Sequence, residues 1–175
     1  MKLVLDIETD GLDPTCIHVA VCKNIESGEV TSFREWDKVF FQSYLNKADQ
    51  VIMHNGISFD LPILERLWGI SFPYTKVLDT LVISQLHNPI RDGGNGLQNW
   101  GNILGFPKDE KPVSFKEFTT QMHNYCVRDV EVTEKVYHKL RSDMKGWSKR
   151  SVDLEHTVRR LMDFHTQNGF FIDQQ

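Results

Sequence analysis

The sequence lacks any apolar stretch that could cross a membrane. No segment approaches the roughly 20 consecutive apolar residues that a spanning helix requires. The first residues, MKLVLDIETDG, bring carboxylates into the region where a signal peptide has an uninterrupted apolar core. We therefore expect an intracellular, cytoplasmic protein without membrane contacts.

Cysteine is also scarce. The chain has only Cys16, Cys22 and Cys126, an odd number without a C-x-x-C pair. This pattern argues against both a disulfide framework and a zinc knuckle. The seven histidines show no zinc-like spacing either. We expect the three cysteines to be reduced and to serve as packing residues.

Positive charge is in deficit, because 20 Lys and Arg face 24 Asp and Glu, for a net charge of −4. This balance argues against wrapping duplex DNA by bulk electrostatic attraction. It does not exclude a small site where bound metal ions supply the positive charge. With 175 residues, of which 40% are hydrophobic, the chain is long enough for one well-cored domain and short for two.

The segment LVLDIETDG, residues 3–11, places acidic residues directly after an apolar run. Residues 2–8 alternate with the period of a β-strand, which puts Asp6 and Glu8 on the same face. Read as D-x-E-x-D-G, the segment could also open a calcium-binding EF-hand loop. The twelfth loop position is Ile17 instead of a bidentate Glu, and a strand precedes Asp6 where the motif needs a helix. The carboxylates therefore need another explanation.

Further along, strand and helix patterns alternate. Strands are predicted at residues 17–25, 29–35 and 50–55. Helices are predicted at residues 39–49, 58–69, 79–87, 97–105, about 115–140 and 152–168. We expect Asp79 to cap the third of these helices and Gly69 and Gly169 to end the second and the last. Residues 91–96, RDGGNG, read as a loop.

Two further carboxylates stand out. Asp129 falls in the apolar stripe of the long helix, where a bare carboxylate costs several kcal/mol unless a metal or a positive partner compensates it. Tyr125 lies one turn earlier, and Asp60 opens a helix after a buried strand. Taken alone, either aspartate is more often a cap or half of a salt bridge. Four converging carboxylates would repel one another, and two divalent cations about 4 Å apart resolve that repulsion in enzymes that cleave phosphodiesters.

The ordered set D-I-E, N-x-x-x-F-D and Y-x-x-x-D resembles the three exonuclease motifs of the DEDD superfamily. Tyr125 stands four residues before Asp129, as in the DEDDy branch, whereas Asn124 occupies the position of the DEDDh histidine. The segments LDTLVISQL, LQNWGNILG and VDLEHTVRRLMDFHTQNGFFID resemble the proofreading exonuclease domain of family A DNA polymerases from short-tailed lytic phages. The last segment is similar to the passage into the polymerase domain.

This resemblance implies an α/β, ribonuclease H-like fold. The expected sheet is mixed and five-stranded, with its first three strands antiparallel and helices on both faces. Residues 1–150 would form the 3′-5′ exonuclease domain. Residues 151–175 would form a C-terminal helix and the start of a connection to a polymerase domain, with NGFFIDQQ opening a further strand.

The resemblance also implies roles for individual residues. Asp6, Glu8 and Asp129 would hold one metal ion, while Asp6 would bridge to a second that Asp60 also reaches. The two ions would be Mg²⁺ or Mn²⁺, and Tyr125 would orient the attacking water. The implied substrate-binding residues are Thr9, Leu12, Asn55 and Phe59, with Leu12 wedged against the terminal base.

The expected activity is metal-dependent removal of nucleotides from single-stranded or frayed DNA 3′ ends. Its context would be proofreading, with a family A polymerase domain in the same polypeptide or as a subunit. A free-standing DEDDy nuclease acting on RNA or single-stranded DNA is the alternative, because the motifs do not read the sugar. A non-catalytic nucleic-acid-binding scaffold is a third possibility, which the presence of every acidic motif residue disfavours.

Overall fold

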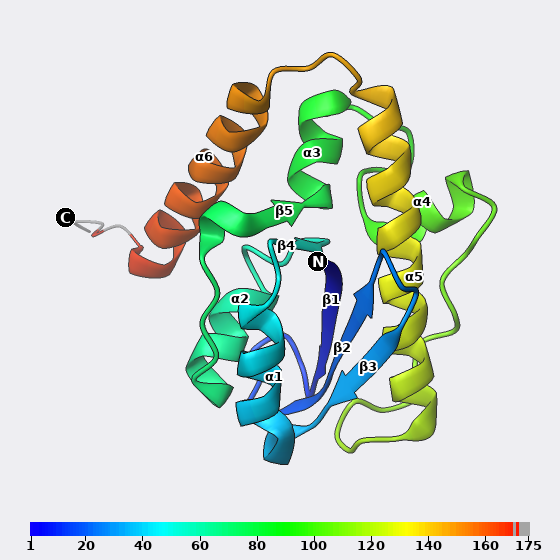
Figure 1. The fold of residues 1–175 in the computed structure, drawn as a ribbon, viewed down its shortest axis with the longest axis vertical. Helices are drawn as coiled ribbons and strands as arrows, with labels where there is room; N and C mark the ends of the chain where they lie inside the picture. Colours follow the sequence, from blue (N-terminus) through cyan, green and yellow to red (C-terminus); the bar gives the residue numbers. More distant parts are fainter. Residues whose placement is uncertain (170, 172–175) are drawn as a thin grey trace.

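The computed structural model describes residues 1–169 and 171, which fold around one mixed five-stranded sheet of order β3-β2-β1-β4-β5 (Figure 1). The first three strands are antiparallel, whereas β4 and β5 extend the sheet in parallel with β1. The strands are β1 (Lys2–Thr9), β2 (Ile17–Asn24), β3 (Val30–Phe33), β4 (Gln50–Met53) and β5 (Val77–Asp79). The predicted fold class is therefore confirmed.

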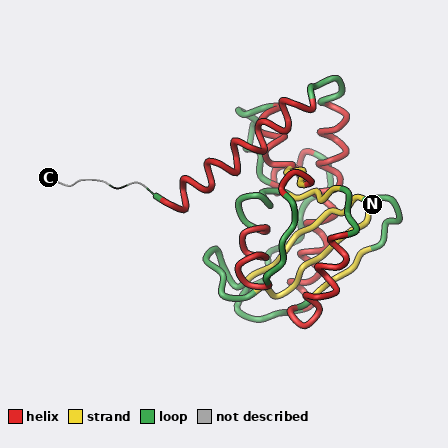
Figure 2. Tube along the Cα trace, turned by 60° about the vertical axis from the view of Figure 1, so that its left-hand side comes forward, coloured by secondary structure: helices red, strands yellow, loops and turns green. Residues whose placement is uncertain are grey.

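Helices cover both faces of this sheet (Figures 1 and 2). They are α1 (Lys38–Asn46), α2 (Asp60–Ile63), α3 (Thr80–His87), α4 (Leu97–Ile103), α5 (Thr120–Asp143) and α6 (Lys149–Asn168). Short helical turns are η1 (Glu35–Asp37), η2 (Leu64–Trp68) and η3 (Tyr74–Lys76). The turn η2 is π-helical and continues α2 to Gly69, whose φ of 67° ends the helix as expected.

The alternation in β1 decides which face each side chain serves. Leu3 and Leu5 pack in the apolar cluster that contains residues of α1 and α2. Val4 packs on the opposite face, against α5. Because side chains alternate along a strand, Asp6 and Glu8 share the face of Val4 and lie on the side of α5. The sheet thereby presents both carboxylates to the long helix.

The starts of α5 and α6 differ most from the sequence-based prediction. Helix α5 begins at Thr120 instead of about residue 115, because Thr119 is extended and its hydroxyl caps the helix by accepting from the Met122 amide at 3.1 Å. Helix α6 begins at Lys149 instead of 152, because the Ser148 hydroxyl caps it. Strand β5, of three residues, was not located from the sequence.

Helix α6 has no buried residue, and its Val152 packs, partly buried, against the core cluster formed by α3, α4 and α5. Polar contacts tie it to the domain: His156 accepts from the Asp79 amide at 2.7 Å, and Ser58 donates to Asp163 at 2.6 Å. Figure 2 shows its C-terminal half extending away from the rest of the molecule. The strand predicted after it falls largely on residues 170 and 172–175, outside the described residues, while Phe171 is 95% exposed and not in a strand.

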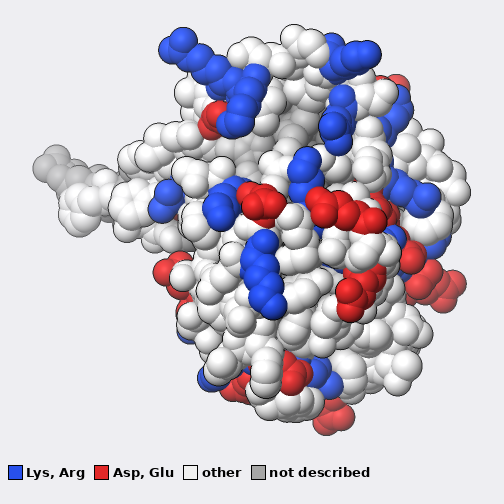
Figure 3. Space-filling model, in the orientation of Figure 1, with Lys and Arg blue, Asp and Glu red and all other residues white. Residues whose placement is uncertain are grey.

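Surface charges of both signs alternate over the face seen in Figure 3, where Lys and Arg surround rows of Asp and Glu.

None of the helices in the described residues combines the length and the apolar composition that a membrane span requires. The described cysteines are all free.

Candidate active site

The four predicted carboxylates converge from three elements. Asp6 and Glu8 come from β1, Asp60 from the first turn of α2, and Asp129 from the middle of α5. The carboxylate of Asp60 accepts a hydrogen bond at 3.2 Å from the amide of Ile7, the residue between Asp6 and Glu8. Ligand atoms of Asp6, Glu8 and Cys126 lie within 4.8 Å of one another. Only Asp6 and Glu8 of the four carboxylates belong to this cluster. Asp60 and Asp129 lie near enough to Asp6 to repel it, so one strand and two helices bring the four acidic groups together.

The loop from β4 to α2 aims Asp60 at this point. Asn55 adopts a left-handed conformation with a φ of 67°, and its amide donates to the Asp79 carboxylate at 2.9 Å. The Ile57 amide donates to the other oxygen of the same carboxylate at 3.1 Å. At Gly56 a Cβ atom would lie 2.4 Å from the Cβ of Met53, so only glycine fits this bend. Asp79 therefore caps α3, as predicted, and also clamps the loop that carries the site.

Burial and mutual repulsion change the acidity of the four groups. Burial, with repulsion from Asp60, Asp129 and Glu8, raises the pKa of Asp6 well above its usual range. Burial is also the first cause for the other three: it raises the pKa of Glu8 to about 8, of Asp60 to about 7 and of Asp129 to about 6. These shifts mean that the site favours protons, or other cations, over bare carboxylates.

Lys108 is a member of the site that sequence reasoning missed. It lies in the loop between α4 and α5, and its ammonium forms a salt bridge with Oδ2 of Asp129. Its Nζ also lies 4.6 Å from the centroid of the Tyr125 ring. Burial alone would lower the pKa of Lys108, but Asp129 and Tyr125 raise it above the usual range. No motif or spacing marks this lysine within the charged segment PKDEK.

The donor set suits divalent cations of the Mg²⁺ or Mn²⁺ type, which prefer carboxylate oxygens. The Oδ1 atom of Asp129 is buried and has no hydrogen-bond partner among the described residues. Such an oxygen is costly unless a cation completes it. The residues present therefore fit the expected metal ions.

Tyr125 and the predicted substrate residues differ in burial and position. Tyr125 is buried on α5 one turn before Asp129. Thr9 is buried, and its hydroxyl donates to the Gly11 carbonyl at 2.8 Å, which fixes the turn that follows β1. Leu12, at the tip of this turn, is 94% exposed.

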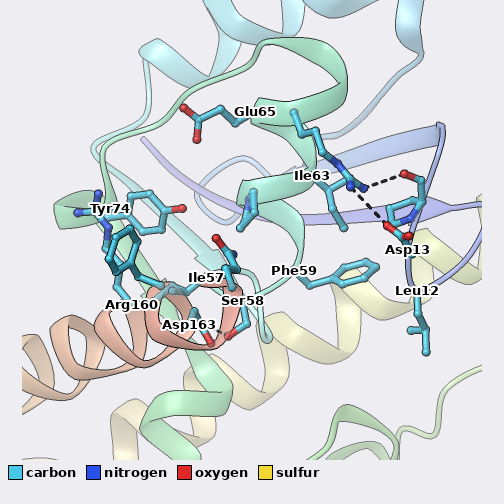
Figure 4. A pocket seen from close by; sticks show the side chains of 15 residues that line it. Leu12, Asp13, Ile57, Ser58, Phe59, Ile63, Glu65, Tyr74, Arg160 and Asp163 are labelled. Atoms are coloured by element: carbon cyan, nitrogen blue, oxygen red, sulfur yellow. Dashed lines mark hydrogen bonds and ion pairs between the residues drawn. The ribbon is translucent and has the colours of Figure 1, made fainter. Parts of the chain in front are cut away.

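Leu12 and Phe59 line one pocket of about 770 Å³, whose other wall is α6. Figure 4 shows the Phe59 ring pointing towards the turn that carries Leu12 and Asp13, and Ser58 bonded to Asp163 of α6. Asn55, by contrast, lies in the bend before α2, where its backbone contacts Asp79. The predicted substrate residues thus lie in three places. Thr9 and Leu12 belong to the turn after β1, Phe59 to the pocket wall, and Asn55 to the loop before α2.

Comparison with known sequences identifies a family and two relatives. Residues 3–120 match the sequence profile of the RNase_H superfamily. The DNA-directed DNA polymerases of Enterobacteria phage T3 and Escherichia phage T7 are 28% and 27% identical to the chain, in alignments that cover 98% of it. The chain spans about a third of the length of these curated relatives, 33% in each case.

Solved structures share the fold. NrnC of Brucella melitensis bound to pGG superposes with a TM-score of 0.71 over 93% of this chain and 84% of NrnC, at 19% identity. The same protein with bound Mg²⁺ gives a TM-score of 0.70, at 19% identity over 93% of this chain and 85% of NrnC. The EXO domain of Aedes aegypti Nibbler gives 0.64 at 8% identity, over 89% of this chain and 85% of that domain.

Proposed function

This chain belongs to the RNase H superfamily, and we propose that it is a metal-dependent 3′-to-5′ exonuclease of the DEDDy type that hydrolyses phosphodiester bonds at DNA 3′ ends. The observation that carries the proposal is the meeting of Asp6, Glu8, Asp60 and Asp129 from three elements, with Tyr125 on the same helix. Their raised pKa values indicate a site built for cations. Two divalent ions are the simplest way to neutralise four carboxylates.

Asp6, Glu8 and Asp129 would hold one ion, and Asp6 with Asp60 the second. When bound, such ions lower the pKa of a water molecule and stabilise charge on the scissile phosphate and the leaving 3′-oxygen. The protein's part is geometric, because the sheet, the clamped loop and α5 hold the oxygens in place before the substrate arrives. Asp129 contributes at least one oxygen, Oδ1, that is buried and free of a hydrogen bond to the described residues.

Tyr125 serves to orient the attacking water, not to remove its proton. A phenol has an ordinary pKa near 10, and burial raises the pKa of Tyr125 further. The side chain therefore stays protonated at neutral pH, when a general base would have to be ionised. A protonated phenol can still donate or accept a hydrogen bond and fix a water molecule.

We further propose that residues 1–150 form the nuclease domain of a family A replicative polymerase and that residues 151–175 lead towards its polymerase domain. The phage T3 and T7 polymerases support this context, because they align with 98% of this chain. The polymerase domain would act in the same polypeptide or as a separate subunit and would deliver mismatched 3′ ends. Thr9, Leu12, Asn55 and Phe59 are the proposed contacts with the terminal nucleotides.

A free-standing DEDDy nuclease acting on RNA or short single-stranded DNA is the second candidate. The observation that favours it is the likeness to NrnC, of which this chain covers 84% in a structure bound to pGG. The two candidates share the site and its chemistry. They differ in the substrate that reaches it and in the need for a polymerase domain.

The test uses 5′-labelled and 3′-labelled oligonucleotides of DNA and RNA, each with Mg²⁺, Mn²⁺ or EDTA. The exonuclease should shorten 5′-labelled single strands one nucleotide at a time, only with metal, and should leave circular single strands intact. Frayed or mismatched ends should be cut faster than blunt GC-rich ends, because opening each terminal pair costs roughly 0.6 to 2.2 kcal/mol of stacking. Shortening from the 5′ end would refute the proposed polarity, while a strong preference for RNA would favour the free-standing nuclease.

A further inference from the structure

The Lys108 ammonium lies inside the acidic site instead of at its rim. Its side chain is 13% exposed and the Asp129 side chain 7% exposed, so the salt bridge between them is largely withdrawn from water. Within residues 1–169 and 171, this is the only ion pair made by any of the four site carboxylates. Lys108 is thus the direct counterion of a cluster that otherwise repels itself.

The loop that carries Lys108 is anchored on both sides. Arg128 of α5 donates a hydrogen bond at 2.9 Å to the Pro107 carbonyl, and its guanidinium carbon lies 3.3 Å from the centroid of the Phe106 ring. At Gly101 of α4, a Cβ atom would lie 3.0 Å from the Phe106 carbonyl oxygen and 3.2 Å from the Lys108 amide. The backbone before Lys108 is therefore packed between α4 and α5, the helix that carries Asp129. This packing fixes the backbone from which the ammonium reaches the site.

The two carboxylate oxygens of Asp129 have different surroundings. Oδ2 is held by Lys108, whereas Oδ1 is buried without a hydrogen-bond partner among the described residues. The salt bridge therefore satisfies only one of the two oxygens, although a buried carboxylate gains by satisfying both. The free Oδ1 points to a second cation, and both cations would then act on one carboxylate.

Charge balance suggests what Lys108 adds. Two divalent ions would neutralise the four carboxylates of Asp6, Glu8, Asp60 and Asp129, which leaves the positive charge of Lys108 in excess. A phosphodiester carries one negative charge, so the strand would restore neutrality when its phosphate enters the site. Lysine binds phosphate well as a compact point charge on a flexible stem, which lets the ammonium move while the backbone stays fixed.

We propose that Lys108 is a further catalytic residue of this site: its ammonium pairs with Asp129 in the metal-free protein and contacts a non-bridging oxygen of the substrate's terminal phosphodiester when metal ions are bound. The inference rests on the proposed nuclease function. It predicts opposite changes in two measured quantities, the affinity for metal ions and the turnover of DNA. Loss of the lysine charge should strengthen metal binding, because a competing cation is gone, and should weaken turnover, because the phosphate loses its partner.

The test compares Lys108→Met, which keeps the aliphatic stem without the charge, with Lys108→Arg, which keeps the charge. Lys116→Met is the matched control, since Lys116 is an exposed lysine of the same interhelical loop. Mn²⁺ affinity is measured by titration calorimetry and by electron paramagnetic resonance of free Mn²⁺. Turnover and KM are measured on a labelled single-stranded DNA, and melting curves confirm that each variant is folded.

Lys108→Met should bind Mn²⁺ at least about fivefold more tightly, the factor expected of one unit charge at about 4 Å even in bulk water. Its turnover should fall about 100-fold, as when one preorganised donor to a developing charge is removed. Lys108→Arg should bind Mn²⁺ like the wild type and recover at least a tenth of its turnover, and Lys116→Met should match the wild type in both.

Weaker Mn²⁺ binding in Lys108→Met would overturn the inference, because Lys108 would then only support Asp129 as a ligand. Unchanged affinity and turnover would overturn it as well. Should Lys108→Met fail to fold, Lys108→Arg decides alone, since a folded arginine variant without measurable turnover would contradict the proposal. Failure of the proposed function looks different, because the wild-type protein itself would then neither bind Mn²⁺ nor shorten DNA.

Discussion

The acidic site and helix α6 hold side chains in unfavourable surroundings of opposite kinds. Asp60 and Asp129 are each 5% exposed and carry charge into the interior. On α6 the reverse holds, because Leu161 is 54% and Phe164 60% exposed, and no residue of the helix is buried. One region buries groups that favour water, whereas the other exposes groups that avoid it.

The difference indicates what each region requires. Carboxylates held by β1, α2 and α5 are fixed by the core, so the proposed metal ions and substrate strand would complete the site without a change of fold. Helix α6 is tied down by polar contacts such as those of His156 and Asp163, and by Val152, while Leu161 and Phe164 stay exposed where a further apolar surface could cover them. We therefore expect changes in the site to remove chemistry and changes on α6 to leave chemistry intact.

The largest effect is expected from Asp6→Ala. Asp6 is the proposed bridge between both metal ions, so its loss should lower the rate of DNA hydrolysis roughly 10³-fold or more while the fold survives. Circular dichroism and melting curves check the fold, and cleavage of a 5′-labelled single strand checks the rate. Because burial and the neighbouring acidic groups disfavour the Asp6 carboxylate in the metal-free protein, the melting temperature in EDTA should not fall. A variant as active as the wild type would refute the site.

A smaller loss is expected from Tyr125→Phe. In the proposed mechanism the phenol only orients water, so its removal should slow turnover roughly 10- to 100-fold, at the lower end of what a positioned hydrogen-bonding group contributes. Asp129→Ala, on the same helix, should come close to abolishing turnover because it removes a proposed metal ligand. Calorimetric Mn²⁺ titration should show near-normal binding in the first variant and weakened binding in the second. If Tyr125→Phe were as inactive as Asp129→Ala, the role assigned to Tyr125 would be wrong.

The two regions also differ in how well the sequence predicts them. The alternation of residues 2–8 correctly placed Asp6 and Glu8 on one face, and the apolar stripe around Asp129 correctly marked a buried carboxylate on a long helix. Both signals are local periodicities, which tertiary packing preserves. The same periodicity placed the start of α5 too early, because Phe118 fits the stripe although Thr119 caps the helix.

Lys108 and β5 could not have been found in this way. The position of Lys108 depends on Gly101 and Arg128, which hold its loop from two different helices. Nothing in the local sequence encodes that arrangement. Strand β5 has three residues, too few for a period of two to be recognised, and it exists through its pairing with β4. Tertiary contacts decided both features.

The pH dependence of stability would show whether the carboxylates are strained without metal. The folded-state pKa of Glu8 is raised to about 8, so the folded chain holds this proton more tightly than the unfolded chain. That stabilisation is present at low pH and is lost as the pH rises through about 8. His54 acts in the opposite direction, since burial lowers its pKa to about 4, but its contribution is complete above pH 7.

Urea unfolding in EDTA should therefore show the free energy of unfolding falling by about 1 kcal/mol or more between pH 7 and pH 9, with Asp6 adding to the loss due to Glu8. Glu8→Gln should reduce this slope. Saturating Mn²⁺ should remove the fall, because bound ions keep the carboxylates ionised in the folded state. A free energy of unfolding that rises between pH 7 and pH 9 in EDTA would contradict the expected strain among the carboxylates.

The smallest effects on the isolated chain are expected on α6. Phe164→Ser and Leu161→Ser alter side chains that are more than half exposed, so the free energy of unfolding should change by no more than about 0.5 kcal/mol. Leu45→Ala, at a fully buried position, should cost about 2 to 5 kcal/mol and is the control for a packing residue. Cleavage of single-stranded DNA by both α6 variants should equal that of the wild type.

The same α6 variants should matter once a polymerase domain is supplied, in the same polypeptide or as a separate subunit. If that domain covers the exposed apolar side of α6, replacing two apolar side chains by serine should weaken its docking and reduce the preference for a mismatched over a matched primer end. The site carboxylates would be untouched, so the rate on a free single strand would stay normal. Variants that keep the full mismatch preference would show that α6 does not dock the polymerase, and unaltered activity of the isolated chain would then favour the free-standing nuclease.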